Sequence, residues 1–198
     1  MKNSLRLAMA ASVAFTASVA SAQVHITEVM SSSGVTDDWI EITNYGSSAI
    51  SISSWRFDDG SFTVGASQAL LGVTSIGAGE SVIFIESANG ANISSFRQFW
   101  GGLGGVQVGY YSGSGLGLSS GGDGAIIFGA GGSEVSRVSF GAATTGSSFF
   151  YGWTVGGAVD VHQYRVHPGC GDSQRILHRP PKRNGCGEAD RLSAAEFG

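Results

Sequence analysis

The stretch from Val24 to Gly60 constrains the fold of this chain more than any other. Within it, Ile40 and Ile42 alternate with other residue types, and after a Tyr-Gly turn Ile50 and Ile52 do the same. A half-buried β-strand requires this period of two, because successive side chains point to opposite faces. With the strand that opens the stretch at Val24, this makes three strands in under forty residues, which predicts an all-β chain.

The first residues have the pattern of a secretory signal peptide. Lys2 and Arg6 precede an apolar, Ala-rich run over residues 7–19, and a small-x-small cleavage signal ends at Ala22. The run is shorter than the roughly 18 apolar residues of a membrane-spanning helix, and no later run reaches that length. We therefore expect removal of residues 1–22 and a mature chain without a membrane span. It should be secreted to the extracellular space, the periplasm or the cell surface.

Composition and charge restrict what the rest of the chain can do. The 32 glycines favour short strands and tight turns, because glycine destabilises a helix by about 1 kcal/mol per residue. Residues 23–160 carry three basic and eleven acidic residues, a net charge of −8 with histidine neutral. A segment this acidic repels phosphate backbones, so we expect no nucleic-acid partner. The length suits a single domain, which we place at residues 23–160.

Periodicity predicts further strands and one short helix. The run over residues 81–85 is apolar on both faces, which is typical of a central strand. Near residues 92–100 the period becomes helical, with Asn92 as the expected N-cap. Ile52 and Trp55 have odd spacing, so a core position for both requires a bulge or break between them. Other strands are predicted over residues 61–64, 70–76, 106–111, 124–128, 134–140 and 149–155.

Residues 161–198 differ in composition from the rest. All three prolines, both cysteines, three of four histidines and six of eleven basic residues lie there, and strand periodicity is lost. One interpretation is an exposed, partly disordered extension. A second is an out-of-frame remnant, which the other reading frames of the coding DNA past Asp160 would test. Cys170 and Cys186 could close a disulfide, worth about 3 kcal/mol, whereas a zinc site with His167 and His178 lacks a close cysteine pair.

Glu28 and Glu41 are the candidate site residues. A hairpin centred between Gly34 and Val35 would place them directly opposite each other, and paired carboxylates can perform acid–base chemistry or hold a cation. Like charges in such positions repel, so the pair should share a proton, a metal ion or an arginine such as Arg56. The alternative is a shifted register, or two glutamates at solvated strand edges. Apart from this pair we expect no cofactor and no metal site.

Other motifs favour structural roles. Ser119 lies in a G-x-S-x-G pattern followed by Asp123 and His162, but the strand–turn–helix context of a nucleophile elbow is missing. The Asp37-Asp38 and Asp58-Asp59 pairs suit turns better than calcium loops, because the spacing of a calcium loop is absent. Large aromatic residues in such a chain are more often core than carbohydrate platform. This last point concerns Trp39, Trp55, Tyr110, Tyr111 and Trp153.

Taken in order, several elements resemble the lamin-tail domain of secreted bacterial proteins. They are Ile26-Thr27-Glu28-Val29, Asp38-Trp39-Ile40-Glu41-Ile42-Thr43-Asn44, Ile50-Ser51-Ile52 with Trp55, Gly79-Glu80 before residues 81–84, Gly115-Leu116-Gly117-Leu118-Ser119 with Asp123-Gly124, and Val138-Ser139-Phe140-Gly141. Together they span most of residues 24–155.

The resemblance implies an immunoglobulin-like β-sandwich with no catalytic residues, in a family whose members are thought to bind, tether or scaffold. Many single-domain relatives end in a Pro-Glu-Pro sorting motif and a hydrophobic anchor, which Pro180-Pro181-Lys182 does not match. We expect an exported, non-enzymatic module whose partner is an extracellular protein, glycan or surface component. The alternatives are a secreted hydrolase using Glu28 and Glu41 or Ser119, and a structural surface protein that self-associates.

Overall fold

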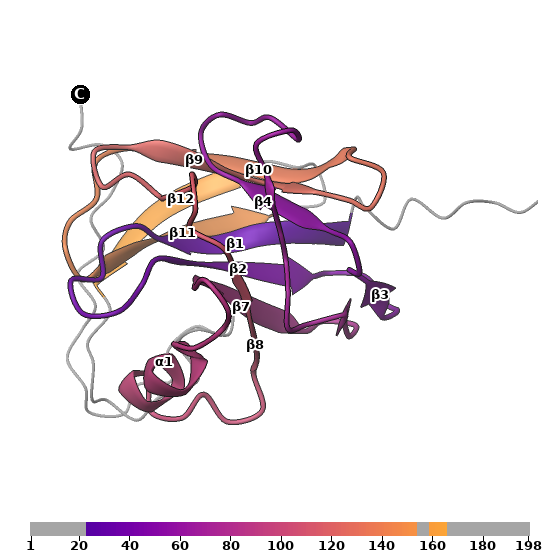
Figure 1. The fold of residues 1–198 in the computed structure, drawn as a ribbon, viewed down its shortest axis with the longest axis horizontal. Coiled ribbons are helices and arrows are strands. Elements are labelled where there is room, and N and C mark those ends of the chain that lie inside the picture. Colours follow the sequence, from indigo (N-terminus) through magenta and orange to yellow (C-terminus); the bar gives the residue numbers. More distant parts are fainter. Residues whose placement is uncertain (1–22, 154–158, 166–198) are drawn as a thin grey trace, which may run out of the picture.

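The computed structural model describes residues 23–153 and 159–165, which form β-strands and one short helix (Figure 1). One group of strands comprises β1 (Val24–Met30), β2 (Trp39–Asn44), β7 (Ser81–Glu86), β8 (Gln107–Tyr111), β11 (Ser147–Trp153) and β12 (Val159–Arg165). A second comprises β4 (Arg56–Asp58), β5 (Gln68–Ala69), β9 (Asp123–Phe128) and β10 (Glu134–Phe140). The remaining elements are β3 (Ile50–Ser51), β6 (Ser75–Ile76) and α1 (Ile93–Phe99).

These strands build a sandwich. The described residues form a six-stranded sheet in the order β12-β11-β1-β2-β7-β8 and a four-stranded sheet in the order β10-β9-β4-β5, with β3 and β6 as a separate pair. Fully buried side chains such as Ile40, Phe84, Phe57 and Ile127 come from both sheets and share one core. The structure therefore confirms the predicted all-β sandwich with a single short helix.

The helix covers the other face of the larger sheet. β7 and β8 are parallel, and a parallel pair needs a crossover, which here contains α1. Phe96 of α1 packs with Met30, Trp39 and Ile85 in a second buried cluster. The strand predicted over residues 81–85 is confirmed, since the four apolar residues 82–85 are completely buried.

Asn92 precedes the helix as predicted, but its side chain makes no capping hydrogen bond. Instead its Nδ2 donates to Oδ2 of Asp37 at 2.7 Å. Asn92 is therefore the N-cap residue as predicted, but its side chain joins the helix start to the loop between β1 and β2.

The predicted break between Ile52 and Trp55 is present. Ser54 has a φ of 66°, and the amide of Trp55 donates to the carbonyl of Ile52 at 3.0 Å. This tight turn separates β3 from β4, and both flanking side chains are buried in the core. The odd spacing of the two apolar residues therefore identified a real interruption.

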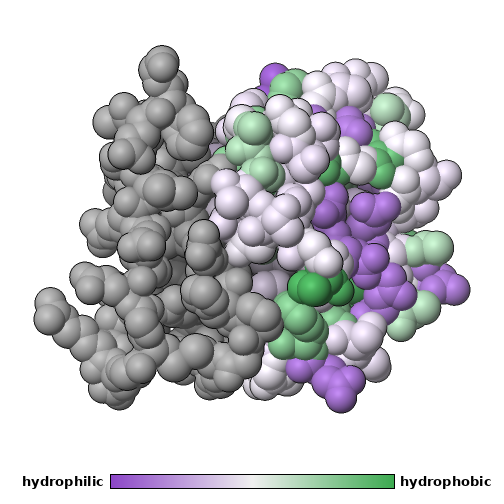
Figure 2. All heavy atoms as spheres, turned by 90° about the vertical axis from the view of Figure 1, so that its left-hand side faces the viewer, coloured by the Kyte–Doolittle hydropathy of each residue, from purple (hydrophilic) through white to green (hydrophobic). Residues whose placement is uncertain are grey.

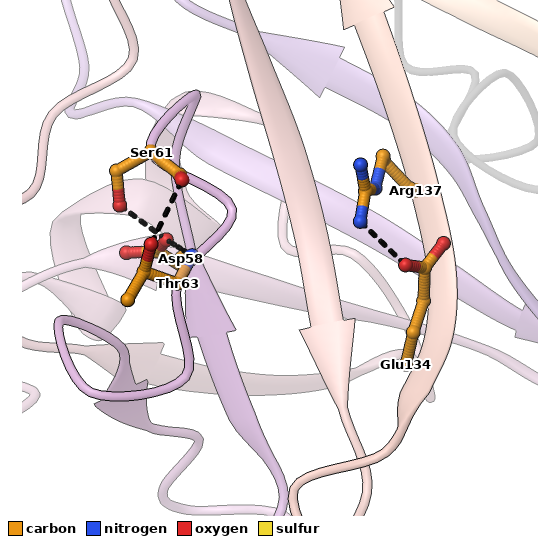
Figure 3. A network of polar contacts seen from close by, with 5 residues as sticks. All are labelled: Asp58, Ser61, Thr63, Glu134 and Arg137. Atoms are coloured by element: carbon orange, nitrogen blue, oxygen red, sulfur yellow. Dashed lines mark hydrogen bonds and ion pairs between the residues drawn. The ribbon is translucent and has the colours of Figure 1, made fainter.

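The strand predicted over residues 61–64 was wrong, because these residues form a turn after β4. Figure 3 shows the reason: Oδ2 of Asp58 accepts hydrogen bonds from the Ser61 hydroxyl and the Thr63 amide, both at 2.6 Å. The buried carboxylate of Asp58 thus accepts hydrogen bonds from groups that would otherwise need an acceptor on a neighbouring strand. The Glu134–Arg137 ion pair lies beside this loop, and the Arg137 guanidinium stacks over the Phe62 ring at 4.4 Å.

Two further stretches differ from their sequence patterns. The segment predicted as one strand over residues 70–76 contributes only β6, and β5 ends just before it. At the other end of the chain β12 pairs with β11 as far as Ser147 and Arg165, beyond the domain end expected at residue 160. No helix among the described residues is long and apolar enough to cross a membrane.

The core explains which substitutions should matter. Phe57 is fully buried, and its ring lies 4.5 Å from that of Tyr111 across the sandwich. Phe57→Ala should lower the free energy of unfolding by about 3–5 kcal/mol. The matched control Val64→Ala, at a side chain 44% exposed, should change it by less than about 0.5 kcal/mol. Chemical denaturation measures both, and equal losses would contradict this assignment of the core.

Candidate functional site

Glu28 and Glu41 lie directly opposite each other in the antiparallel pair β1–β2. This is the pairing that a hairpin centred between Gly34 and Val35 requires. The register shifts between Ile26 and Glu28, so Thr27 is the extra residue of a bulge. As a result Thr27 and Glu28 both face away from the sandwich core, while Ile26 and Val29 face into it.

Both carboxyl groups are buried, with 7% of Glu28 and 1% of Glu41 exposed. β1 and β2 are interior strands of the six-stranded sheet, so neither glutamate is at a sheet edge. The neighbouring strands place Phe150 beside Glu28 and Ile83 beside Glu41. The alternative of two solvated edge residues therefore does not hold.

Hydroxyl groups are the main partners of these carboxyls. Oε1 of Glu41 accepts from the Thr27 hydroxyl at 2.6 Å, and the chain of hydroxyls continues through Thr43 to Ser81. Oε1 of Glu28 accepts from the Ser148 hydroxyl of β11. Oε2 of Glu41 is buried and has no hydrogen-bond partner among the residues that the structure describes. One buried carboxyl oxygen of the pair thus has no partner among the described side chains.

Burial determines the protonation of this pair. It raises the pKa of Glu28 from 4.5 to about 7, although the Ser148 hydrogen bond opposes the shift. Burial and the charge of Glu28 raise the pKa of Glu41 well above its ordinary value, against the hydrogen bonds from Thr27 and Thr43. Burial and the neighbouring carboxyl thus both favour the protonated form of Glu41.

The expected alternatives to a proton are not seen near the pair. Arg56 lies on β4 in the other sheet, where its guanidinium donates to the Ser67 hydroxyl and carbonyl. Within the described part of the chain, no cluster of three or more His, Cys, Asp or Glu side chains is arranged to hold a metal ion. The geometry fits a carboxyl pair that retains a proton.

A second acidic group lies at the end of the same sheet. The amide of Glu86 donates to the carbonyl of Asp38 at 2.8 Å, so these two residues are neighbours across β2 and β7. Burial and the charges of Glu86 and Asp37 raise the pKa of Asp38 to about 7. Burial and Asp37 also raise the pKa of Glu86. We call these three residues the acidic end.

The serine motif has a structural role. Asp123 accepts hydrogen bonds from the amides of Gly60, Ser119 and Gly124 at 2.8–2.9 Å, and so fastens two loops to β9. Ser119 is exposed in a loop, and its hydroxyl accepts from the Gly121 amide. A Cβ at Gly124 would lie 2.2 Å from the Phe62 ring, so a larger residue there would displace that ring. His162 lies on β12, and its side chain is outside the described atoms.

The remaining candidate site residues lie either in the hydrophobic core or outside the residues that the structure describes. Trp39, Trp55 and Tyr111 are buried, so these aromatic residues belong to the core. Cys170 and Cys186, with His167 and His178, lie outside the described residues. Sequence reasoning missed the hydroxyl partners of the glutamates, although Thr27, Thr43, Ser81 and Ser148 are small polar residues inside otherwise apolar strands.

Protonation of the pair should make stability depend on pH. The pKa of Glu28 is higher in the folded chain than in the unfolded one, so its contribution is fully present below about pH 4.5 and is lost as pH rises through about 7. Glu28→Gln removes the charge but keeps an acceptor for Ser148. It should raise the free energy of unfolding at pH 8 by about 2–3 kcal/mol and change it little at pH 4.

Denaturant titrations from pH 4 to 8 measure this dependence. Asp38 titrates in the same range, so the informative quantity is the difference between Glu28→Gln and wild type. Glu134→Gln, at an exposed carboxylate paired with Arg137, is the matched control and should leave the pH profile of the wild type in place. A variant that is less stable than wild type at pH 8 would contradict the proton-holding pair.

Comparison with known proteins agrees with this architecture. The family model of the Lamin Tail Domain matches residues 17–142, a range that contains β1 to β10 and so the hairpin of Glu28 and Glu41. No curated protein matches the chain. The match covers more than half of the sequence and confirms the resemblance drawn from its motifs, so the chain belongs to the Lamin Tail Domain family.

Proposed function

We propose that this chain is an exported, non-enzymatic binding and scaffolding module, whose partner is a protein, glycan or surface component outside the cytoplasm. Membership of the Lamin Tail Domain family supports a non-enzymatic immunoglobulin-like module. The signal-like sequence of residues 1–22 supports export.

The burial of Glu28 and Glu41 is the main support for a non-enzymatic function. Glycoside hydrolysis needs two carboxyl groups that flank the scissile bond, so both must reach the substrate. Here only 7% of Glu28 and 1% of Glu41 is exposed, and a hydroxyl of the same sheet donates to one oxygen of each carboxyl. A hydrolase that uses these glutamates is therefore disfavoured.

Other reactive side chains are also engaged in holding the fold. Asp58 and Asp123 accept hydrogen bonds from loop amides, including the amide of Ser119, while the Ser119 hydroxyl accepts from the Gly121 amide. This pattern suits a rigid scaffold that presents loops, since loops on a stable sandwich commonly carry binding residues.

The charge of the surface limits the kind of partner. Residues 23–153 contain ten acidic residues and three arginines. Each arginine has a partner within the domain: Arg56 contacts Ser67, Arg97 donates to the carbonyl of Val106, and Arg137 pairs with Glu134. Such a surface favours neutral or cationic partners over polyanions.

A binding experiment on the secreted product tests the proposal. Mass spectrometry of that product should show a chain that begins at Gln23. The immobilised chain should then retain a reproducible component from extracellular-matrix or cell-wall fractions, and Glu28→Gln should retain it equally well. Phe57→Ala, with its core disrupted, is the control for non-specific capture.

Three results would contradict it. They are an intracellular product that keeps residues 1–22, retention no greater than that of Phe57→Ala, and release of cleaved sugar or peptide that is lost in Glu28→Gln. Self-association would appear instead as retention of the chain's own copies.

A further inference from the structure

A groove of about 410 Å³ lies between the β1–β2 loop and α1. Val35 in its lining is 67% exposed, whereas Phe96 in the same lining is almost fully buried. Asp37 adds a carboxylate to the same lining. The complete lining is Val35, Thr36, Asp37, Ser95, Phe96, Gln98 and Phe99. The groove thus has a mixed lining, in which three apolar residues lie among polar ones and one carboxylate.

The acidic end adjoins this groove. Asp37 belongs to both, Asp38 follows it in the chain, and Glu86 lies opposite Asp38. No arginine of residues 23–153 pairs with these carboxylates in the described structure, because each has the partner named above. Figure 2 shows this end of the molecule, where hydrophilic residues lie beside a small hydrophobic patch. The carboxyl groups of the acidic end therefore have no cationic partner among the described residues.

The described chain also finishes at this end. Arg165, the last residue of β12, is opposite Ser147 at the start of β11. The preceding residue, Gly146, donates its amide to the carbonyl of Ser32 in the β1–β2 loop at 2.8 Å. Arg165 therefore lies at the same end of the sheet as the β1–β2 loop, with β11 between β12 and β1.

Residues 175–183 of that segment have the complementary chemistry. Their sequence, Arg-Ile-Leu-His-Arg-Pro-Pro-Lys-Arg, contains four Lys or Arg residues, two adjacent aliphatic residues and no acidic residue. The ten residues from 165 to 175 span up to about 33 Å when extended, enough to cross this end of the sandwich. Pro180 and Pro181 favour an extended backbone, which lowers the entropy lost on docking.

We propose that residues 175–183 of the same chain occupy the groove between the β1–β2 loop and α1. Ile176 and Leu177 would lie against Val35 and Phe99, and the cationic side chains would face Asp37, Asp38 and Glu86. This docking is independent of the binding function proposed above. The docking depends only on the residues that the chain carries at positions 175–183. It would be the same if residues 161–198 were an out-of-frame remnant.

Lys182 provides a specific test, because it is the only lysine of residues 23–198. A carbodiimide joins an amine to a carboxylate only when the two are in contact. In the full mature chain at low salt, the main cross-linked peptide should join Lys182 to the peptide of Asp37 and Asp38 or to that of Glu86. The yield should fall several-fold in 1 M salt, because screening weakens contacts between exposed charges.

Charge variants complete the experiment. Asp38→Asn combined with Glu86→Gln should reduce the cross-link at this end several-fold, while Glu134→Gln on β10 should not. Removal of two neighbouring like charges should leave the sandwich folded, as near-UV circular dichroism can verify. Val35→Ser should also lower the yield if the aliphatic contact contributes.

Two outcomes would overturn the proposal. One is cross-linking of Lys182 to Glu80, Asp123 or Glu134 as often as to the acidic end. The other appears when ¹⁴N- and ¹⁵N-labelled chains are mixed: cross-links that join the two isotopes would show docking between copies, whereas the proposed contact gives only unmixed products.

Discussion

The burial of β1 and β2 on both faces is the constraint on which the rest of this structure depends. One face of these strands supplies Ile26, Ile40 and Ile42 to the sandwich core. The other face is covered as well, and it carries Glu28 and Glu41 in directly opposite positions. Two ionised carboxylates buried side by side carry a large desolvation cost, so burial favours the protonated form in this sheet. The stability of the central hairpin is therefore expected to depend on pH.

The bulge at Thr27 makes this arrangement possible. Because Thr27 is an extra residue in β1, it and Glu28 both face the α1 side of the sheet. The Thr27 hydroxyl can then donate to Glu41 while Glu28 remains in register with it. A regular strand would have turned one of these two side chains into the apolar core. The hydroxyls of Thr43, Ser81 and Ser148 extend the same polar layer across four strands.

Much of the fold was predictable where one physical signal dominates. Apolar residues on both faces identified β7, the helical period identified α1, and the odd spacing of Ile52 and Trp55 identified the break before β4. The same spacing argument applies to Ile26 and Val29, which both enter the core, and it would have located the bulge at Thr27. The pairing of the glutamates followed from the centre of the hairpin alone.

Other features depend on contacts distant in sequence. The loop after β4 has an alternating pattern, but the buried carboxylate of Asp58 takes its donors. The parallel pairing of β7 with β8 depends on the crossover through α1, which no local pattern of either strand encodes. The burial of the glutamates likewise depends on what covers the outer face of the sheet. Sequence could therefore place Glu28 and Glu41 opposite each other but could not show that they are closed to substrate.

Titration of the two glutamate side-chain carboxyls by ¹³C NMR tests the central claim most directly. Spectra from pH 4 to 9, with each signal assigned by comparison with its glutamine variant, should show Glu28 with a midpoint near 7, where burial raises its pKa from 4.5. Glu41 should titrate above its ordinary range for the same reason, strengthened by the charge of Glu28. Midpoints near 4.5 for both residues in the folded chain would contradict a buried, proton-holding pair.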